Sequence, residues 1–206
     1  MTRTACWTLV VTLLLLAGCA RIGPAKVGPL RGHLLEPVAL PAAVAPAPAA
    51  PLLRLATVRA VQELDGTQML YRNAGAEVAA YARNVWAAPP AEQVARWAVA
   101  ALERAGGVAG VIAPGGRGVA TLRLESELLA LHHDHTVAPS RAVLELRVQL
   151  IAQPGQRVLT TRRLRAVAEA PSDDPDGGVA AANRALAEVL AELAAFVQAQ
   201  VAAPAR

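Results

Sequence analysis

The clearest pattern in the chain is an alternation of apolar and polar positions in its second half. Leucine or valine alternates with charged or amide residues in segments 120–130 and 142–150, and segment 158–168 continues the pattern after a turn at Pro154-Gly155. Strict alternation buries one face of a strand and leaves the other in water, which is typical of antiparallel sheets. The pattern therefore predicts three consecutive antiparallel strands.

Shorter strands are predicted upstream of these three. Segment 52–61 is apolar on both faces, which favours an interior strand. Segments 67–72 and 77–86 flank Asn73-Ala74-Gly75, whose composition suits a hairpin turn.

Two helices are predicted to cover the buried face of the sheet. Apolar residues recur at helical spacing between Pro89-Pro90, which suits a helix start, and Gly106-Gly107, which suits a helix end. A second helical stripe runs from about residue 178 to residue 202. The predicted fold class is α+β: a two-layer sandwich, mainly antiparallel sheet, with two helices packed on one face.

Residues 1–18 have the features of a lipoprotein signal peptide. Arg3 is followed by an apolar run, residues 7–16, that is shorter than the roughly 20 residues needed to cross a bilayer. The run ends in Leu16-Ala17-Gly18-Cys19, which resembles the lipobox of bacterial lipoproteins. The resemblance implies lipidation of Cys19, with diacylglycerol on its sulfur and an acyl chain such as palmitate on its new amine. An ordinary secretory signal that contains Cys19 is the alternative.

The cysteines and the residue after Cys19 extend this interpretation. Cys6 leaves with the signal, so Cys19 is the only cysteine of the mature chain and no internal disulfide can form. Ala20, not aspartate, follows Cys19, which resembles the sorting signal for the outer membrane. We expect a lipid anchor in the outer membrane with the protein at its periplasmic face; the inner membrane is the alternative.

The mature chain is interpreted as a tether followed by one domain. Residues 19–51 comprise the lipidated cysteine and a Pro/Ala-rich segment with seven prolines, a composition that favours extended polyproline II. Residues 52–206 are long enough to bury a core of their own. Without the signal, 19 basic and 16 acidic residues are spread along the chain, so no nucleic-acid partner is expected.

A search for catalytic motifs gives no support for an enzyme. Gly115-Gly116-Arg117-Gly118 lacks the lysine and hydroxyl residue of a phosphate-binding loop, and its place between two strands suits a turn. No Gly-x-Ser-x-Gly motif is present, and no nucleophile, base and orienting group occur together.

Two clusters resemble metal sites and are interpreted otherwise. In His132-His133-Asp134-His135, strand geometry points His133 and His135 to one side and His132 with Asp134 to the other, so at most two ligands converge. Because catalytic zinc usually needs three protein ligands, a solvated strand end or turn is preferred over a metal site. Asp173-Asp174-Pro175-Asp176 lacks the rest of a calcium loop, and helix capping accounts for it better.

Large apolar side chains gather in one third of the predicted domain. The set could line an apolar groove for lipid or a partner's helix. Ordinary core packing is the alternative and the more common fate of such side chains. The candidate contact residues are Met69, Tyr71, Tyr81 and Trp86.

Short motifs in a fixed order resemble the ABC-type transport auxiliary lipoprotein family, the PqiC-like lipoproteins that accompany MCE-domain lipid transporters. The order is more specific than any one motif, and it covers about residues 52–200. The motifs are Met69-Leu70-Tyr71-Arg72, Trp86-Ala87-Ala88-Pro89-Pro90, Ala101-Leu102-Glu103-Arg104, Leu128-Leu129-Ala130-Leu131, Pro139-Ser140-Arg141, Pro171-Ser172-Asp173-Asp174-Pro175 and Ala181-Ala182-Asn183.

The resemblance implies a non-enzymatic periplasmic component of a system that moves lipids between the inner and outer membranes. An MCE-domain protein would be the direct partner, and the ABC permease and ATPase would complete the complex. Docking is expected through the hairpin with Tyr71 and Trp86 and through the polar sheet face. A homo-oligomer is left open. The main alternative is a cell-envelope assembly lipoprotein that supports lipopolysaccharide insertion or a secretin.

Overall fold

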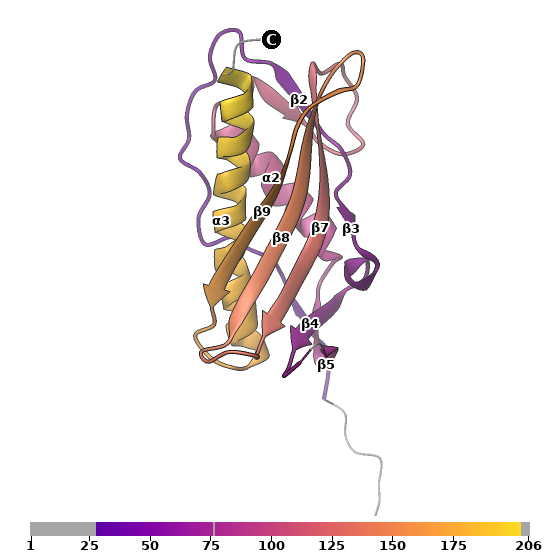
Figure 1. Cartoon of the computed structure of the whole chain (residues 1–206), viewed down its shortest axis with the longest axis vertical. Coiled ribbons are helices and arrows are strands. Elements are labelled where there is room, and N and C mark those ends of the chain that lie inside the picture. Colours follow the sequence, from indigo (N-terminus) through magenta and orange to yellow (C-terminus); the bar gives the residue numbers. More distant parts are fainter. Residues whose placement is uncertain (1–27, 76, 203–206) are drawn as a thin grey trace, which may run out of the picture.

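The structure, a computed structural model, describes residues 28–75 and 77–202 and places two helices on one face of a nine-stranded sheet (Figure 1). The helices are α2 (Pro90–Arg104) and α3 (Pro175–Ala202), and η2 (Gln62–Leu64) is a short 3₁₀ turn. The strands are β1 (Arg31–His33), β2 (Leu52–Leu55), β3 (Arg59–Ala60), β4 (Gln68–Arg72), β5 (Val78–Trp86), β6 (Gly110–Ile112), β7 (Leu122–Asp134), β8 (Arg141–Ala152) and β9 (Arg157–Glu169). The α+β sandwich predicted from the sequence is confirmed.

The long strand β7 organises the sheet. On one side it pairs antiparallel with β8, which pairs antiparallel with β9, as the alternating segments predict. On the other side β2, β3 and β4 each run parallel to a successive part of β7. A further column beyond them consists of β6 beside β2 and β5 beside β4, with β1 outermost beside β5. The long strands are thus antiparallel, and the short ones add parallel pairings.

Segment 52–61 forms two short strands instead of the single interior strand predicted from its apolar pattern. β2 ends at Leu55 and β3 begins at Arg59, and residues 56–58 between them lie outside regular pairing. Both strands still follow β7, because the N–H groups of Ala56 and Val61 donate to carbonyls of β7. The apolar pattern of segment 52–61 predicts that both faces of the segment are buried, but it contains no signal for the interruption between the two strands.

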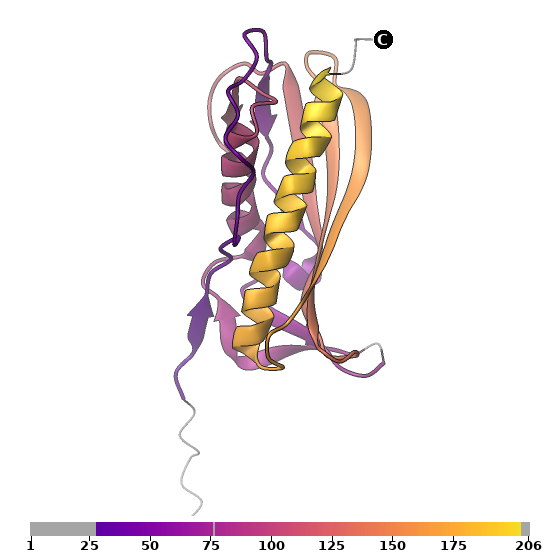
Figure 2. The ribbon, with the colours of Figure 1, turned by 90° about the vertical axis from the view of Figure 1, so that its left-hand side faces the viewer.

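The two helices supply the apolar layer over the sheet (Figure 2). α3 packs on β8 and β9, and Leu186, Val189 and Leu190 are fully buried there. Its first turn is capped by Asp174, whose carboxylate accepts the Gly177 N–H at 2.8 Å, in agreement with the capping interpretation. Within the described residues, α3 is also the one helix long and apolar enough to span a membrane by length and composition.

Residues 34–44, here called the strap, lie along the outer side of the helix layer. Leu35 is fully buried; its N–H donates to Gln93 of α2 at 2.8 Å, and its carbonyl accepts the Trp97 indole N–H at 2.6 Å. The next residue donates its N–H to Asn183 of α3 at 2.9 Å, so the strap bridges both helices. The prediction that the tether extends to residue 51 and the domain begins at 52 is therefore wrong, because the strap and β1 are built into the fold.

The sheet face that points away from the helices is polar. Its ion pairs are Arg163–Glu145 at 3.0 Å, Arg147–Glu127 at 3.6 Å and Arg123–Glu125 at 2.9 Å. Pairs this exposed add little to stability because water screens them. They do leave a broad, charged and regular surface.

Candidate functional site

Two of the four predicted contact residues lie in the core. Met69 is 2% exposed and Trp86 is 3% exposed, and both belong to the main hydrophobic cluster. The expectation that Trp86 is exposed on the hairpin is wrong, because β5 ends against the helix layer and turns Trp86 inward. The ordinary alternative, core packing at the junction of hairpin and helix, holds for this pair.

Tyr71 and Tyr81 lie at the other end of the hairpin and remain half-buried. Their rings are 4.6 Å apart between centroids and tilted by 36°. They reach this arrangement from neighbouring strands, since Tyr71 of β4 pairs with Ala79 of β5, two residues before Tyr81. The structure thus divides the predicted set into a core pair and a pair at the hairpin end of the sheet.

A chain of hydrogen bonds starts from the Tyr81 hydroxyl. The hydroxyl oxygen lies 2.8 Å from His133 Nδ1 and 2.8 Å from His135 Nε2. His133 Nε2 lies 2.9 Å from the Ser140 hydroxyl, which donates to the Asp173 carboxylate. We name this set the Tyr–His chain.

One assignment of protons satisfies every member of the Tyr–His chain. Because Ser140 gives its proton to Asp173, its oxygen accepts from His133 Nε2–H, and the bare Nδ1 of His133 accepts from Tyr81. The oxygen of Tyr81 then accepts from His135. The Ser140 proton points to a carboxylate and not to the imidazole, so the arrangement does not activate Ser140 as a nucleophile.

Burial keeps the centre of the Tyr–His chain neutral. Burial, with the neighbouring His135 adding to it, lowers the pKa of His133 to about 4 even though Asp173 opposes the shift. Burial and the neighbouring Tyr71 raise the pKa of Tyr81 to about 12. At neutral pH the chain therefore links β5, β7, β8 and the start of α3 without carrying charge on either ring.

The histidine cluster is partly as predicted. His133 and His135 converge, with ring centroids 4.0 Å apart, whereas His132 lies on the opposite side. The expected solvated strand end is wrong for His133, which is 3% exposed. Within the described residues no group of three or more His, Cys, Asp or Glu side chains could hold a metal ion.

The physical reason for the burial of His133 is an irregularity in β7. The register between β7 and β8 shifts between Leu128 and Ala130, so that one extra residue enters β7. Before the shift Leu124 and Leu128 face the core, and after it Leu131 and His133 do. A bulge of this kind reverses which face each later side chain takes.

The glycine-rich segment forms a turn, as expected. Gly115 and Gly118 have φ values of 78° and 137°, which suit glycine. The Arg54 guanidinium donates to the Gly116 carbonyl at 2.7 Å and to the Gly118 carbonyl at 2.6 Å. These two hydrogen bonds hold the segment against β2.

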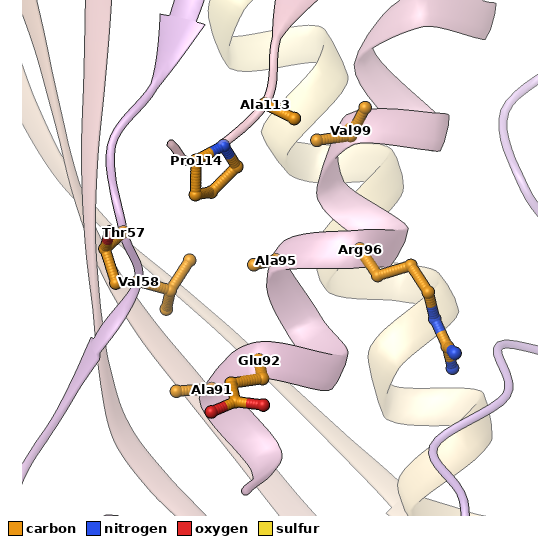
Figure 3. A pocket seen from close by; sticks show the side chains of 9 residues that line it. All are labelled: Thr57, Val58, Ala91, Glu92, Ala95, Arg96, Val99, Ala113 and Pro114. Atoms are coloured by element: carbon orange, nitrogen blue, oxygen red, sulfur yellow. The ribbon is translucent and has the colours of Figure 1, made fainter. Parts of the chain in front are cut away.

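An apolar cleft is the feature that sequence patterns do not reveal. It measures about 400 Å³ and opens between α2, the 57–58 segment and the end of β6 (Figure 3). The helix contributes Ala91, Ala95 and Val99, Glu92 stands at the rim, and the guanidinium of Arg96 points away from the cleft (Figure 3). From the sequence, alanines on a helix are expected to be ordinary packing residues. The cleft exists because the strand opposite them is interrupted between β2 and β3.

Comparisons with known proteins give the family. The sequence model of the "ABC-type transport auxiliary lipoprotein component" family matches residues 33–194. The chain belongs to this family, which confirms the resemblance drawn from its ordered motifs. A comparison with curated proteins finds no match.

Solved structures agree with this membership. A crystal structure of a Xanthomonas campestris protein of the DUF330 family is 25% identical, with a TM-score of 0.69, and the match covers 82% of this chain and 96% of that one. An uncharacterized protein is 17% identical, with a TM-score of 0.60, over 80% of this chain and 99% of the other. A hypothetical protein from Chlamydia trachomatis is 13% identical, with a TM-score of 0.50, over 75% and 99%. The last two show a shared fold.

The lipidation site predicted at Cys19 lies outside the described residues, as does the signal peptide.

Proposed function

We propose that this chain is a non-enzymatic, membrane-tethered docking component of an ABC transport system that moves lipids between the two membranes of the envelope. The observation that carries the proposal is the family match over residues 33–194, which makes it a transport-auxiliary lipoprotein. The direct partner is an MCE-domain protein, with the ABC permease and ATPase behind it. The anchor is diacylglycerol and an N-acyl chain on Cys19, in the periplasmic leaflet of the outer membrane.

The place where β1 joins the sheet supports a particular orientation. β1 pairs with Asn84–Trp86, the end of β5 farther from the hairpin turn, and the chain enters the domain at the end of the molecule that carries β4 and β5 (Figure 1). Eight residues, 20–27, and so nine Cα–Cα steps, separate the lipidation site Cys19 from Gly28. A fully extended chain spans about 3.3 Å per residue, so the anchor allows a separation of about 30 Å. The domain is thus held near the membrane by its hairpin end.

The surfaces left for docking are the hairpin end and the polar sheet face. Since Trp86 is buried, the exposed large apolar side chain of the hairpin is Val78, which is 53% exposed. Val78 pairs with Arg72 and therefore lies on the opposite face of the hairpin from Tyr71. The charged sheet face adds Arg–Glu pairs that a partner can exchange for its own charges.

Co-purification after crosslinking tests the proposal. The full chain with its signal peptide is expressed with a C-terminal tag in its own host, crosslinked in cells and purified from membranes. We expect the MCE-domain protein and the permease among the crosslinked partners, and less of both with Val78→Asp. Capture of a secretin or of an outer-membrane barrel in their place would contradict the proposal. A tagged lipoprotein without this domain is the control.

A further inference from the structure

The sheet contains an unoccupied strand position beside β3. The strands β2, β3 and β4 follow one another along the same edge of β7. In the next strand position of the sheet, β6 pairs with β2 and β5 pairs with β4. Among the described strands, β3 pairs with β7 alone. β6 ends at Ile112, and the chain leaves this strand position at Ala113-Pro114. A gap therefore separates β6 from β5.

The backbone of this stretch faces the gap. The N–H groups of Ala56 and Val61 donate to Leu124 and Leu128 of β7, at 2.9 Å and 3.1 Å. These two bonds lie five residues apart, so the alternation of the backbone is interrupted within residues 56–58. In β3, where the pairing with β7 is regular, the Val61 N–H points to β7, and the N–H of Ala60, the residue before it, is therefore directed away from β7, toward the gap. An open strand edge of this kind is a template for another extended chain.

The apolar cleft lies at the same place. Thr57 and Val58 form its sheet side and Ala113 with Pro114 its upper end, whereas the small side chains Ala91 and Ala95 of α2 form the opposite wall (Figure 3). A strand placed in the gap would send alternate side chains toward α2. The cleft is the space those side chains would need.

We propose that this gap receives an extended, mainly apolar peptide segment of a partner protein, which adds a strand to the edge of β3 in line with β6. The open edge argues for a peptide, because a strand edge is satisfied by backbone N–H and C=O groups, which an acyl chain lacks. Apart from Thr57 and Glu92, the side chains that face the cleft are apolar, and the guanidinium of Arg96 points away from it, so the site favours an apolar segment (Figure 3). About four residues, spanning about 13 Å, would fill the stretch beside residues 57–60. The assignment of the partner to the transport system rests on the proposed function.

Two substitutions separate strand addition from simple contact. Ala60→Pro removes the N–H directed into the gap and leaves the bond of Val61 to β7 intact. Ala60→Ser has nearly the same volume as alanine and keeps the N–H, so it is the matched control. Ala95→Leu fills the cleft from the helix side. Thermal unfolding of each purified variant confirms that the domain remains folded.

The test uses p-benzoylphenylalanine in place of Glu92, at the rim of the cleft, in the full membrane-anchored chain. Irradiation of cells followed by mass spectrometry of the crosslinked peptides reads out the occupant. We expect crosslinks to one contiguous segment of one partner protein. Their yield should fall at least tenfold with Ala60→Pro and with Ala95→Leu and stay within twofold with Ala60→Ser.

The outcomes that overturn the inference are distinct from those that overturn the proposed function. Crosslinks to lipid, to a second copy of this chain or within the chain would overturn strand addition, as would equal yields with Ala60→Pro and Ala60→Ser. If the MCE-domain protein co-purifies but no partner segment crosslinks at position 92, the inference alone fails. If the crosslinked segment belongs to a protein outside any transport system, the proposed function fails and the peptide site stands. If the MCE-domain protein does not co-purify and no partner segment crosslinks at position 92, the inference and the proposed function both fail.

Discussion

At the scale of single residues, His133 makes the stability of the domain depend on pH. Burial lowers its pKa to about 4, whereas an unfolded chain has a histidine pKa of about 6.5. Between these values the unfolded state binds a proton that the folded state does not, so stability falls as the pH falls. From pH 7 to pH 5 the free energy of unfolding should drop by about 2 kcal/mol, which urea titrations at both pH values measure.

The control for this prediction is His133→Leu, which removes the titrating group. The loss of stability between pH 7 and pH 5 should shrink, leaving a smaller part from His132, whose pKa burial also lowers. Asp173 and Asp174 act at lower pH, because hydrogen bonds from Ser140 and Gly177 lower their pKa values and their contribution is lost only on further acidification. An unchanged loss in His133→Leu would show that other groups carry the pH dependence.

Gly178 gives a second prediction at this scale. A Cβ at this position would lie 2.5 Å from His133 Nδ1 and 2.9 Å from its Cγ. Alanine favours a helix over glycine by about 1 kcal/mol, yet the clash should outweigh this gain and destabilise Gly178→Ala by about 1–3 kcal/mol. Gly66→Ala, where the nearest atom is 3.9 Å away, is the control. Equal urea midpoints for the two variants would contradict the close packing of α3 on His133.

The histidines also show how far residue-level prediction reaches. The two-residue alternation of side chains along a strand correctly placed His133 and His135 on one side and His132 on the other. It could not say which side is the core, because one extra residue between Leu128 and Ala130 reverses the faces downstream. That residue is specified by pairing with β8, not by local sequence. Only the structure places the Ser140 hydroxyl between the His133 imidazole and the carboxylate of Asp173, which is distant in sequence.

At the scale of elements, the strap is the part that sequence misassigned. A Pro/Ala-rich segment is extended whether it floats as a tether or packs on a surface, so composition predicts the same backbone for both. The buried side chain of Leu35 and the hydrogen bonds of its backbone to Gln93 and Trp97 show that the segment is packed on the domain and is not a free tether. By contrast, the hairpin, the long strands and both helices follow from patterns repeated over many residues, and these were predicted correctly.

Substitution of two adjacent leucines tests whether the strap is part of the domain. Leu35 is fully buried and Leu34 is 43% exposed. Leu35→Ala should destabilise the domain by about 2–5 kcal/mol through lost burial and a residual cavity, whereas Leu34→Ala should cost less than about 1 kcal/mol. Guanidinium titrations of the soluble domain that begins at residue 28 measure both. Equal effects would mean that the strap contributes nothing specific.

Removal of the whole strap extends the same test. A chain that begins at residue 52, the boundary predicted from sequence, loses β1 and the contacts of Leu35 with α2. We expect it to unfold at lower denaturant concentration than the chain that begins at residue 28, or to aggregate through the uncovered helix surface. A stable, monomeric fragment with an unchanged midpoint would restore residue 52 as the boundary.

At the scale of the whole molecule, the strap shortens the segment that separates the predicted lipidation site from the folded domain. The sequence predicted a tether of residues 19–51, whereas the folded part begins by residue 31, with β1. With the proposed lipid on Cys19, the domain would be held close to the membrane. The ordered motifs were enough to predict the family. They lie in strands β4 and β7 and in both helices, as well as at the turn before β8 and at the start of α3. The gap was not predictable, because it is an absence created by strands far apart in sequence.

The anchor gives the last prediction. Cys19→Ser removes the thiolate that would accept diacylglycerol, and a hydroxyl is not a substitute for that nucleophile. The domain should fold normally and move from the membrane to the soluble periplasmic fraction, because no covalent acyl chain remains to hold it there. Transport should be lost even though the docking surfaces are intact, because the domain is no longer held within about 30 Å of the bilayer. Fractionation with immunoblotting measures release, and complementation of a deletion strain measures transport. Cys6→Ser, in the cleaved signal, is the matched control and should change neither. A Cys19→Ser protein that stays membrane-bound and supports transport would show that contacts other than the lipid place it.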